Sequence, residues 1–172
     1  MNSQKMLDSL RQFGRMLPEV VRDVAKDDSR WKPSDGAWSI LEVVCHLADE
    51  EEFDFRERIK LTLADPNRSW PPIDPEAWAV ERRYNEGNLN EAVARFGSLR
   101  NQSVRWMRSL ENPDWTRTYH HSKLGPVRAG DILAAWVAHD YLHLRQISKR
   151  MYQMAARDAG DYSVRYAGEW GA

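Results

Sequence analysis

The sequence predicts an all-α fold in which four helices pack as a bundle. Four separate segments carry apolar residues at helical spacing, and a long proline-rich segment divides the second of them from the third. Strand-forming residues are confined to a short stretch before the last segment. A chain of 172 residues is expected to form a single domain over 1–172, with its core over about 4–157 and a C-terminal tail over 158–172.

The first helix is expected over residues 4–26, where apolar side chains recur every three or four positions. Pro18 falls inside this pattern, so a kink or a break is expected there. Residues 27–36 are rich in Pro, Gly and Asp, and this composition predicts a loop.

The second helix is expected to begin at Ser39, because Ser39 and Glu42 have the spacing of a capping box. Its apolar stripe continues past the acidic run 49–52, whose charges are typical of a solvated helix face. Residues 65–87 contain four prolines. They are expected to form the crossover connection of the bundle, with a short helix near Pro75.

The third helix is expected over residues 89–111 and the last over about 130–157, both from apolar residues at helical spacing. Residues 115–129 lie between them and have strand propensity on both sides of Gly125-Pro126. This pattern predicts a short hairpin that turns at these two residues.

Composition excludes several classes of function. The chain has 26 acidic and 25 basic residues, so its net charge of −1 creates no global field to attract nucleic acid or an anionic membrane. No apolar run approaches the roughly 18 residues that span a bilayer, and the N-terminus has no apolar signal region. The single cysteine, Cys45, suits a reducing compartment. We therefore expect a cytoplasmic protein with no nucleic-acid or membrane partner.

Three histidines carry the strongest chemical signal. His139 and His143 are four residues apart on the inward face of the last helix, so their imidazoles can share a metal ion. His46 lies on the inward stripe of the second helix and joins them if the two helices face each other. Three imidazoles with one open position are typical of a catalytic Zn²⁺-type site. The competing interpretation is a set of buried histidines that hydrogen-bond to their neighbours.

Other residues have weaker patterns. The spacing of His139 and His143 also matches a metalloprotease helix, but Asp140 stands where the glutamate base would be and no third histidine follows. Glu50, one turn beyond His46, is expected to lie outside the metal's coordination sphere, because a catalytic ion needs an open position. Adjacent residues of a strand point to opposite faces, so His120 and His121 are expected at the surface, where one of them could act as an acid or base.

Long stretches of the chain resemble the DinB-like superfamily, which includes the YfiT-like metal-dependent hydrolases. The resemblance covers about residues 30–157 and is carried by residues 31–33 (WKP), 36–49 (GAWSILEVVCHLAD) and 136–147 (WVAHDYLHLRQI). It implies a four-helix bundle with a long crossover and a short hairpin before the last helix. It also implies one divalent metal ion held by His46, His139 and His143. Relatives of known activity include transferases that use bacillithiol or mycothiol, an isomerase and amidase-like hydrolases.

We therefore expect a metal-dependent hydrolase or thiol S-transferase that acts on a small molecule, with a low-molecular-weight thiol as one candidate substrate. The ion would be Zn, Ni or Fe, and a homodimer is a compatible assembly. Asp140 and Gln146 are the candidate catalytic residues. Asp140 or Glu50 would orient a ligand imidazole or act as general base, and Gln146 would orient a substrate or water. The connection 65–87, Trp38 and the hairpin near His120 are expected to border the metal cavity. The alternatives are a non-catalytic metal- or small-molecule-binding bundle and a purely structural bundle.

Overall fold

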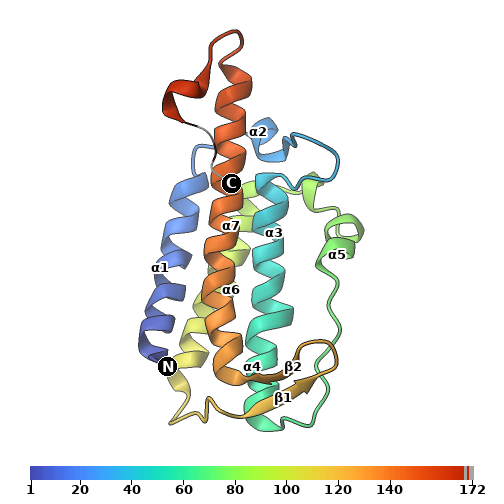
Figure 1. The fold of residues 1–172 in the computed structure, drawn as a ribbon, viewed down its shortest axis with the longest axis vertical. Coiled ribbons are helices and arrows are strands. Elements are labelled where there is room, and N and C mark those ends of the chain that lie inside the picture. The colour runs from blue at the N-terminus through green and yellow to red at the C-terminus, as the bar shows by residue number, and fades with distance from the viewer. Residues whose placement is uncertain (169, 171–172) are drawn as a thin grey trace.

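Four long helical rods run side by side in the computed structural model, which describes residues 1–168 and 170 (Figure 1). The rods are α1 (Ser3–Val21), α3 (Ile40–Asp49) continued by α4 (Phe55–Ala64), α6 (Leu89–Ser109) and α7 (Ala129–Asp158). The predicted all-α bundle is therefore confirmed. Among the described residues, no helix combines the length and the hydropathy that spanning a bilayer requires.

The first rod is shorter than its apolar pattern predicted. α1 ends at Val21 rather than near residue 26, and Pro18 lies inside the helix without ending it. A separate short helix, α2 (Lys26–Arg30), stands where a loop was expected. Its first turn holds two aspartates and its last turn holds Arg30, charges that complement the helix dipole. The Pro, Gly and Asp content of residues 27–36 predicted a loop, although the charges of α2 are typical of a short helix.

The second rod begins as the sequence predicted. Ser39 Oγ accepts the Glu42 backbone N–H at 3.1 Å, and Glu42 Oε2 accepts the Ser39 backbone N–H at 2.7 Å. The rod then contains a π-helical turn, η1 (Glu50–Asp54), which the sequence analysis did not predict. This turn buries Glu50, Glu51 and Asp54. The acidic run is therefore not the solvated face that its charges suggested.

The crossover connection passes outside α3 and carries the expected short helix, α5 (Pro75–Glu81), followed by a 3₁₀ turn, η2 (Tyr84–Glu86) (Figure 1). Asp74 caps α5 by accepting the Ala77 backbone N–H at 3.0 Å. Pro75 occupies the first position of the helix, where its missing N–H costs nothing.

The expected hairpin is present as β1 (Thr118–His121) and β2 (Gly125–Arg128), an antiparallel pair that leads directly into α7. Its turn lies before Gly125 rather than on it, since His121 is paired with Gly125 and Pro126 belongs to the second strand. Gly125 has φ +74°, a conformation that a side chain would strain, and this explains why glycine closes the turn. In the C-terminal tail, residues Val164–Ala167 form the 3₁₀ turn η3.

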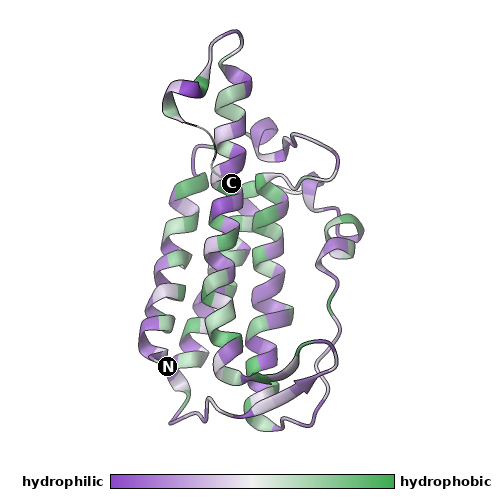
Figure 2. Cartoon of the chain, in the orientation of Figure 1, coloured by the Kyte–Doolittle hydropathy of each residue, from purple (hydrophilic) through white to green (hydrophobic). Residues whose placement is uncertain are grey.

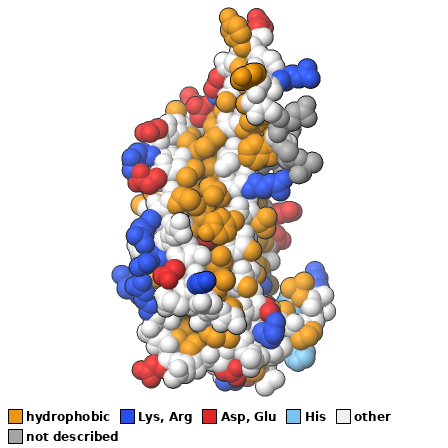
Figure 3. All heavy atoms as spheres, turned by 60° about the vertical axis from the view of Figure 1, so that its left-hand side comes forward, with side chains coloured by type: hydrophobic (Ala, Val, Ile, Leu, Met, Phe, Trp, Pro, Cys, Tyr) orange, Lys and Arg blue, Asp and Glu red, His pale blue; other side chains and the backbone are white. Residues whose placement is uncertain are grey.

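The apolar core has two parts, with a buried charge between them. One part surrounds Phe13 and Phe96, and the other surrounds Leu10 and Trp136. Arg100 lies between the two parts, within 5.7 Å of the ring centres of Phe96 and Trp136. Hydrophobic and hydrophilic residues alternate along every rod, as expected for helices with one buried face (Figure 2). On the side that carries α1, hydrophobic side chains also form a run along the surface (Figure 3). That two copies of the chain pair as a homodimer stays a prediction.

Candidate metal centre

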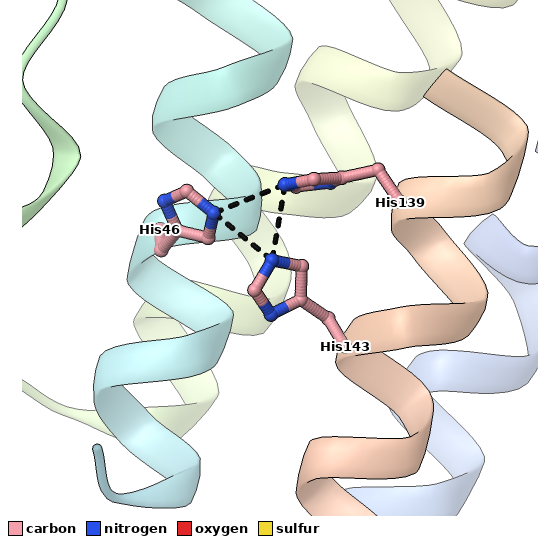
Figure 4. Close-up of side chains that lie close together, drawn as sticks. All are labelled: His46, His139 and His143. Atoms are coloured by element: carbon pink, nitrogen blue, oxygen red, sulfur yellow. Dashed lines mark hydrogen bonds between the residues drawn. The ribbon is translucent and has the colours of Figure 1, made fainter. Parts of the chain in front are cut away.

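The three predicted histidines converge on one point between α3 and α7 (Figure 4). Nε2 of His46 lies 3.2 Å from Nε2 of His139 and 3.1 Å from Nε2 of His143, and the latter two atoms are 3.0 Å apart. His139 and His143 approach from successive turns of α7, as their spacing predicted, and His46 approaches from the facing rod. His46 is only 4% exposed.

The three imidazole rings cannot satisfy all of one another's hydrogen-bonding needs. Burial, with a contribution from the neighbouring imidazoles, lowers the pKa of His46 to about 3 and that of His139 to about 2. Burial also lowers the pKa of His143, so all three rings are neutral at physiological pH. A neutral Nε2 is either a donor or an acceptor. In a triangle of three such atoms, at least one pair therefore joins two like nitrogens. A cation at the centre removes this conflict.

The spacing of the nitrogens fits a single divalent ion. At a metal–nitrogen distance of about 2.0–2.1 Å, neighbouring ligands lie about 2.9 Å apart in an octahedral site and about 3.3 Å apart in a tetrahedral one. The observed separations of 3.0–3.2 Å fall between these values. Because imidazole suits Zn, Ni and Fe alike, the donor set leaves the identity of the metal open.

One of the three imidazole rings is held by a polar partner. Nδ1 of His143 donates to Oε1 of Gln146 at 2.8 Å, which fixes the tautomer and leaves the Nε2 lone pair free for a metal. In the structure Gln146 contacts the His143 ring, and its expected role in orienting substrate or water stays a prediction. Among the described residues, Nδ1 of His46 and Nδ1 of His139 have no hydrogen-bond partner. Gln146 thus orients the His143 ring.

Replacing Gln146 with leucine is expected to weaken divalent-metal affinity by about 10–100-fold, the range typical of side chains that orient a ligand. The variant keeps the volume of the side chain but removes the acceptor for His143 Nδ1. Competition with a chelator measures the affinity. Gln102→Leu on the exposed side of α6 is the matched control. Equal affinities in the two variants would show that the hydrogen bond does not support the site.

A buried acidic pair lies beside the centre. Oε1 of Glu50 is 3.6 Å from Nδ1 of His46, the ring nitrogen that faces away from the other two histidines. This position supports the prediction that Glu50 is not a metal ligand. Burial and the adjacent Asp54 carboxylate raise the pKa of Glu50, and Asp54 in turn pairs with Arg58 on the next turn. The π-helical turn therefore places the carboxyl group of Glu50 next to His46, with Asp54 on the far side of Glu50.

Asp140 has a different role from the one its position in the motif suggested. Both of its carboxylate oxygens accept from Arg100, at 2.7 and 2.8 Å, inside the bundle. Arg100 also donates to Glu51 at 2.6 Å, and Glu51 accepts from Trp136 at 2.9 Å. Asp140 therefore orients no imidazole ring. The network instead connects α7 to α6 and the π-helical turn.

This network depends on a glycine of α1. A Cβ atom added to Gly14 would lie 2.8 Å from Cγ of Arg100, closer than real side chains approach. The absent side chain of Gly14 therefore gives the Arg100 stem its path through the core.

The walls of the site agree only partly with the sequence-based expectation. The ring of Trp38 lies 5.0 Å from that of His46, as expected, and the ring of Phe55, which was not predicted, lies 5.0 Å from that of His139. From the crossover connection, Trp70 instead stacks on Tyr119 of the hairpin at 4.1 Å. The described contacts thus do not support the expectation that residues 65–87 border the metal cavity.

The remaining candidates lie outside the centre. His120 is exposed, and Nδ1 of His121 accepts the backbone N–H groups of Lys123 and Leu124, which stabilises the hairpin turn. Cys45 faces a different cavity, together with Asp49 and Phe53. Burial raises the pKa of its thiol to about 11, so the thiol stays protonated.

Comparison with known proteins agrees with this geometry. A Bacillus subtilis protein named “Putative metal-dependent hydrolase YfiT” is 25% identical over 151 residues, which cover 86% of this chain and 84% of that protein. An Oceanobacillus iheyensis protein named “Putative metal-dependent hydrolase OB0782” is 24% identical over 142 residues, which cover 83% of this chain and 81% of that protein.

The fold and the family follow from two further matches. A solved structure, described as YfiT from Bacillus subtilis, “a probable metal-dependent hydrolase with an unusual four-helix bundle topology”, superposes with a TM-score of 0.79 at 21% identity. The match covers 89% of this chain and 87% of that one. The sequence model of the DinB superfamily matches residues 9–147, which include all three histidines. The chain therefore belongs to the DinB superfamily.

Proposed function

We propose that this protein is a metal-dependent hydrolase of small molecules, in which His46, His139 and His143 hold one divalent ion. The observation that carries the proposal is the triangle of three Nε2 atoms, 3.0–3.2 Å apart and partly buried between α3 and α7. The names of the two relatives, which describe metal-dependent hydrolases, support it.

When bound, the ion would supply Lewis acidity that polarises a carbonyl group and makes water more acidic. Side chains around the three histidines would orient the rings and limit the access of water. Gln146 holds the His143 ring in the tautomer that presents Nε2. The aromatic rings of Trp38 and Phe55 line the ligands and keep bulk water away from them. Glu50 lies behind the His46 ring, 3.6 Å from Nδ1, where its carboxyl group can position that ring.

Thiol S-transfer is the alternative reaction at the same centre. In that reaction a divalent ion stabilises a thiolate and makes it the nucleophile. Cys45 cannot supply the thiol, because it lines another cavity and its pKa is raised to about 11. The thiol would therefore belong to a low-molecular-weight second substrate.

The test uses protein stripped of metal and reloaded with Zn²⁺, Ni²⁺ or Fe²⁺. Each form is assayed against a panel of esters and amides and, separately, for transfer of a low-molecular-weight thiol to an electrophile. We expect hydrolysis that appears with metal, needs no thiol and is absent from His46→Ala. Turnover only when thiol is added would establish the transferase. A metal-loaded protein with neither activity, or equal activity without metal, would contradict the hydrolase and favour a binding module.

A further inference from the structure

A cavity of about 280 Å³ lies beside the metal centre, along α7. It shares one residue with the centre, since Gln146 both lines the cavity and accepts from the ligand His143. A second connection runs through Arg150, which lines the cavity and donates from Nε to the backbone oxygen of Trp38 at 2.6 Å. The ring of Trp38 in turn packs against His46. Two lining residues thus contact residues of the centre.

Arg150 is a buried cation without an anionic partner. It is 7% exposed, and its described hydrogen bonds go to the Trp38 backbone oxygen and to the neutral side chain of Gln153. Within the described part of the chain, no carboxylate lies at ion-pair distance from its guanidinium. The carboxylate of Glu42 attracts the Arg150 guanidinium from a longer distance, but it already forms an ion pair with Lys32 at 3.0 Å. A buried guanidinium is costly unless an anion compensates it.

Arg100 shows how this chain compensates the charge of a buried arginine when the anionic partners are its own carboxylates. Arg100 is 2% exposed and contacts two carboxylates, those of Glu51 and Asp140. Arg150 borders open space instead. The rest of the lining adds positive charge and no acid, since its described members are Leu142, Arg145, Gln146, Lys149, Arg150 and Trp170. Arg145 and Lys149 are exposed and form no ion pair with any described residue.

We propose that this cavity binds the anionic group, a carboxylate or a phosphate, of a small-molecule substrate whose reacting end lies at the three histidines. The proposal rests on the proposed function and names the substrate class for it. The planar guanidinium of Arg150 offers donors to two oxygens of such a group at once. Arg145 and Lys149 add long-range attraction at the rim, and Trp170 provides an apolar wall for the body of the substrate.

The first experiment uses metal-free protein, so that a bound ion cannot itself attract the probe. Succinate, inorganic phosphate and the neutral analogue succinamide are titrated separately, and the NMR resonances of arginine side-chain Nε–H groups and tryptophan indoles are followed. We expect saturable shifts of Arg150 and Trp170 with succinate or phosphate and none with succinamide. The better of the two anions identifies the preferred headgroup. Absence of saturable shifts with both anions, or equal binding of succinamide, would overturn the proposal.

The second experiment compares variants by the affinity for the better anion. Arg150→Gln is expected to weaken it by about tenfold or more, because a charge-assisted pair is lost. Arg105→Gln on the exposed side of α6 makes the same change of charge and is expected to have no effect. Because Arg150 also holds Trp38, the double variant Arg145→Gln/Lys149→Gln tests the rim without disturbing that contact, and a smaller loss is expected. Equal losses in Arg150→Gln and Arg105→Gln would contradict a specific site.

Metal affinity separates this proposal from the proposed function. Arg150→Gln that stays folded by circular dichroism is expected to bind one divalent ion as the native protein does. Loss of anion binding with retained metal binding supports the cavity. A native protein that binds anions but no metal would contradict the hydrolase and leave the cavity standing. One that binds metal but no anion would contradict the cavity alone.

Discussion

Replacing His46 with alanine is expected to abolish stoichiometric binding of a divalent metal ion. The remaining pair, His139 and His143, come from a single helix, and two imidazoles alone hold a divalent ion weakly. Metal content after dialysis, and affinity by competition with a chelator, measure the loss on protein whose folding is verified by circular dichroism. His120→Ala, on the exposed strand of the hairpin, removes a histidine without touching the centre and should bind one ion per chain.

Glu50→Gln completes this comparison. Its carboxylate lies behind the His46 ring rather than among the three Nε2 atoms, so affinity should fall by no more than about 10–100-fold. Equal losses in Glu50→Gln and His46→Ala would mean that Glu50 binds the metal and closes the site. Full metal binding by His46→Ala would remove the three-histidine centre altogether.

Replacing Arg100 with methionine is expected to lower the free energy of unfolding by about 3–5 kcal/mol, the usual cost of removing one partner from a buried ion pair. Methionine fills much of the space but leaves the carboxylates of Glu51 and Asp140 buried without a counter-charge. Urea denaturation measures the change. Arg11→Met, which breaks a surface pair with Asp8, is the control and should leave stability nearly unchanged. If Arg100→Met fails to fold, Asp140→Asn provides the milder test of the same network.

The pH dependence distinguishes uncompensated charge from poor packing. Burial raises the pKa of Asp140 to about 6 even beside Arg100, and the pKa should rise further without that cation. An unfolded aspartate titrates near 3.9, so between the two values the folded variant binds a proton that the unfolded chain does not. Stability contributed in this way is present at low pH and is lost as pH rises through the window. The deficit of Arg100→Met should therefore be smaller at pH 5 than at pH 8. A deficit independent of pH would indicate a packing defect alone.

The sequence predicted most of the fold, because apolar periodicity directly reflects which side of a helix is buried. The same reasoning brought His46, His139 and His143 together, since all three lie on inward stripes of facing rods. The capping box at Ser39 was also predicted, because a cap is a local pattern of two residues three apart.

What could not be predicted depends on contacts between distant residues. The acidic run 49–52 looks solvated until Arg100, far along the chain, is known to lie beside Glu51. Asp140 looks like a catalytic base for the same reason, since its partner is on another helix. The π-helical turn Glu50–Asp54 shifts the helical phase by one residue, and no local pattern marks that insertion.

The close approach of Gly14 and Arg100 also limits how this core can evolve. A methyl group at Gly14 collides with the Arg100 stem, so Gly14→Ala is harmful while the arginine is present. Once the arginine is replaced by a shorter side chain, the same methyl group would help to fill the space that is left. The two positions are therefore epistatic, and the order of substitutions matters. A lineage that first loses the arginine and then gains a side chain at position 14 has no simple way back, because restoring either residue alone is destabilising.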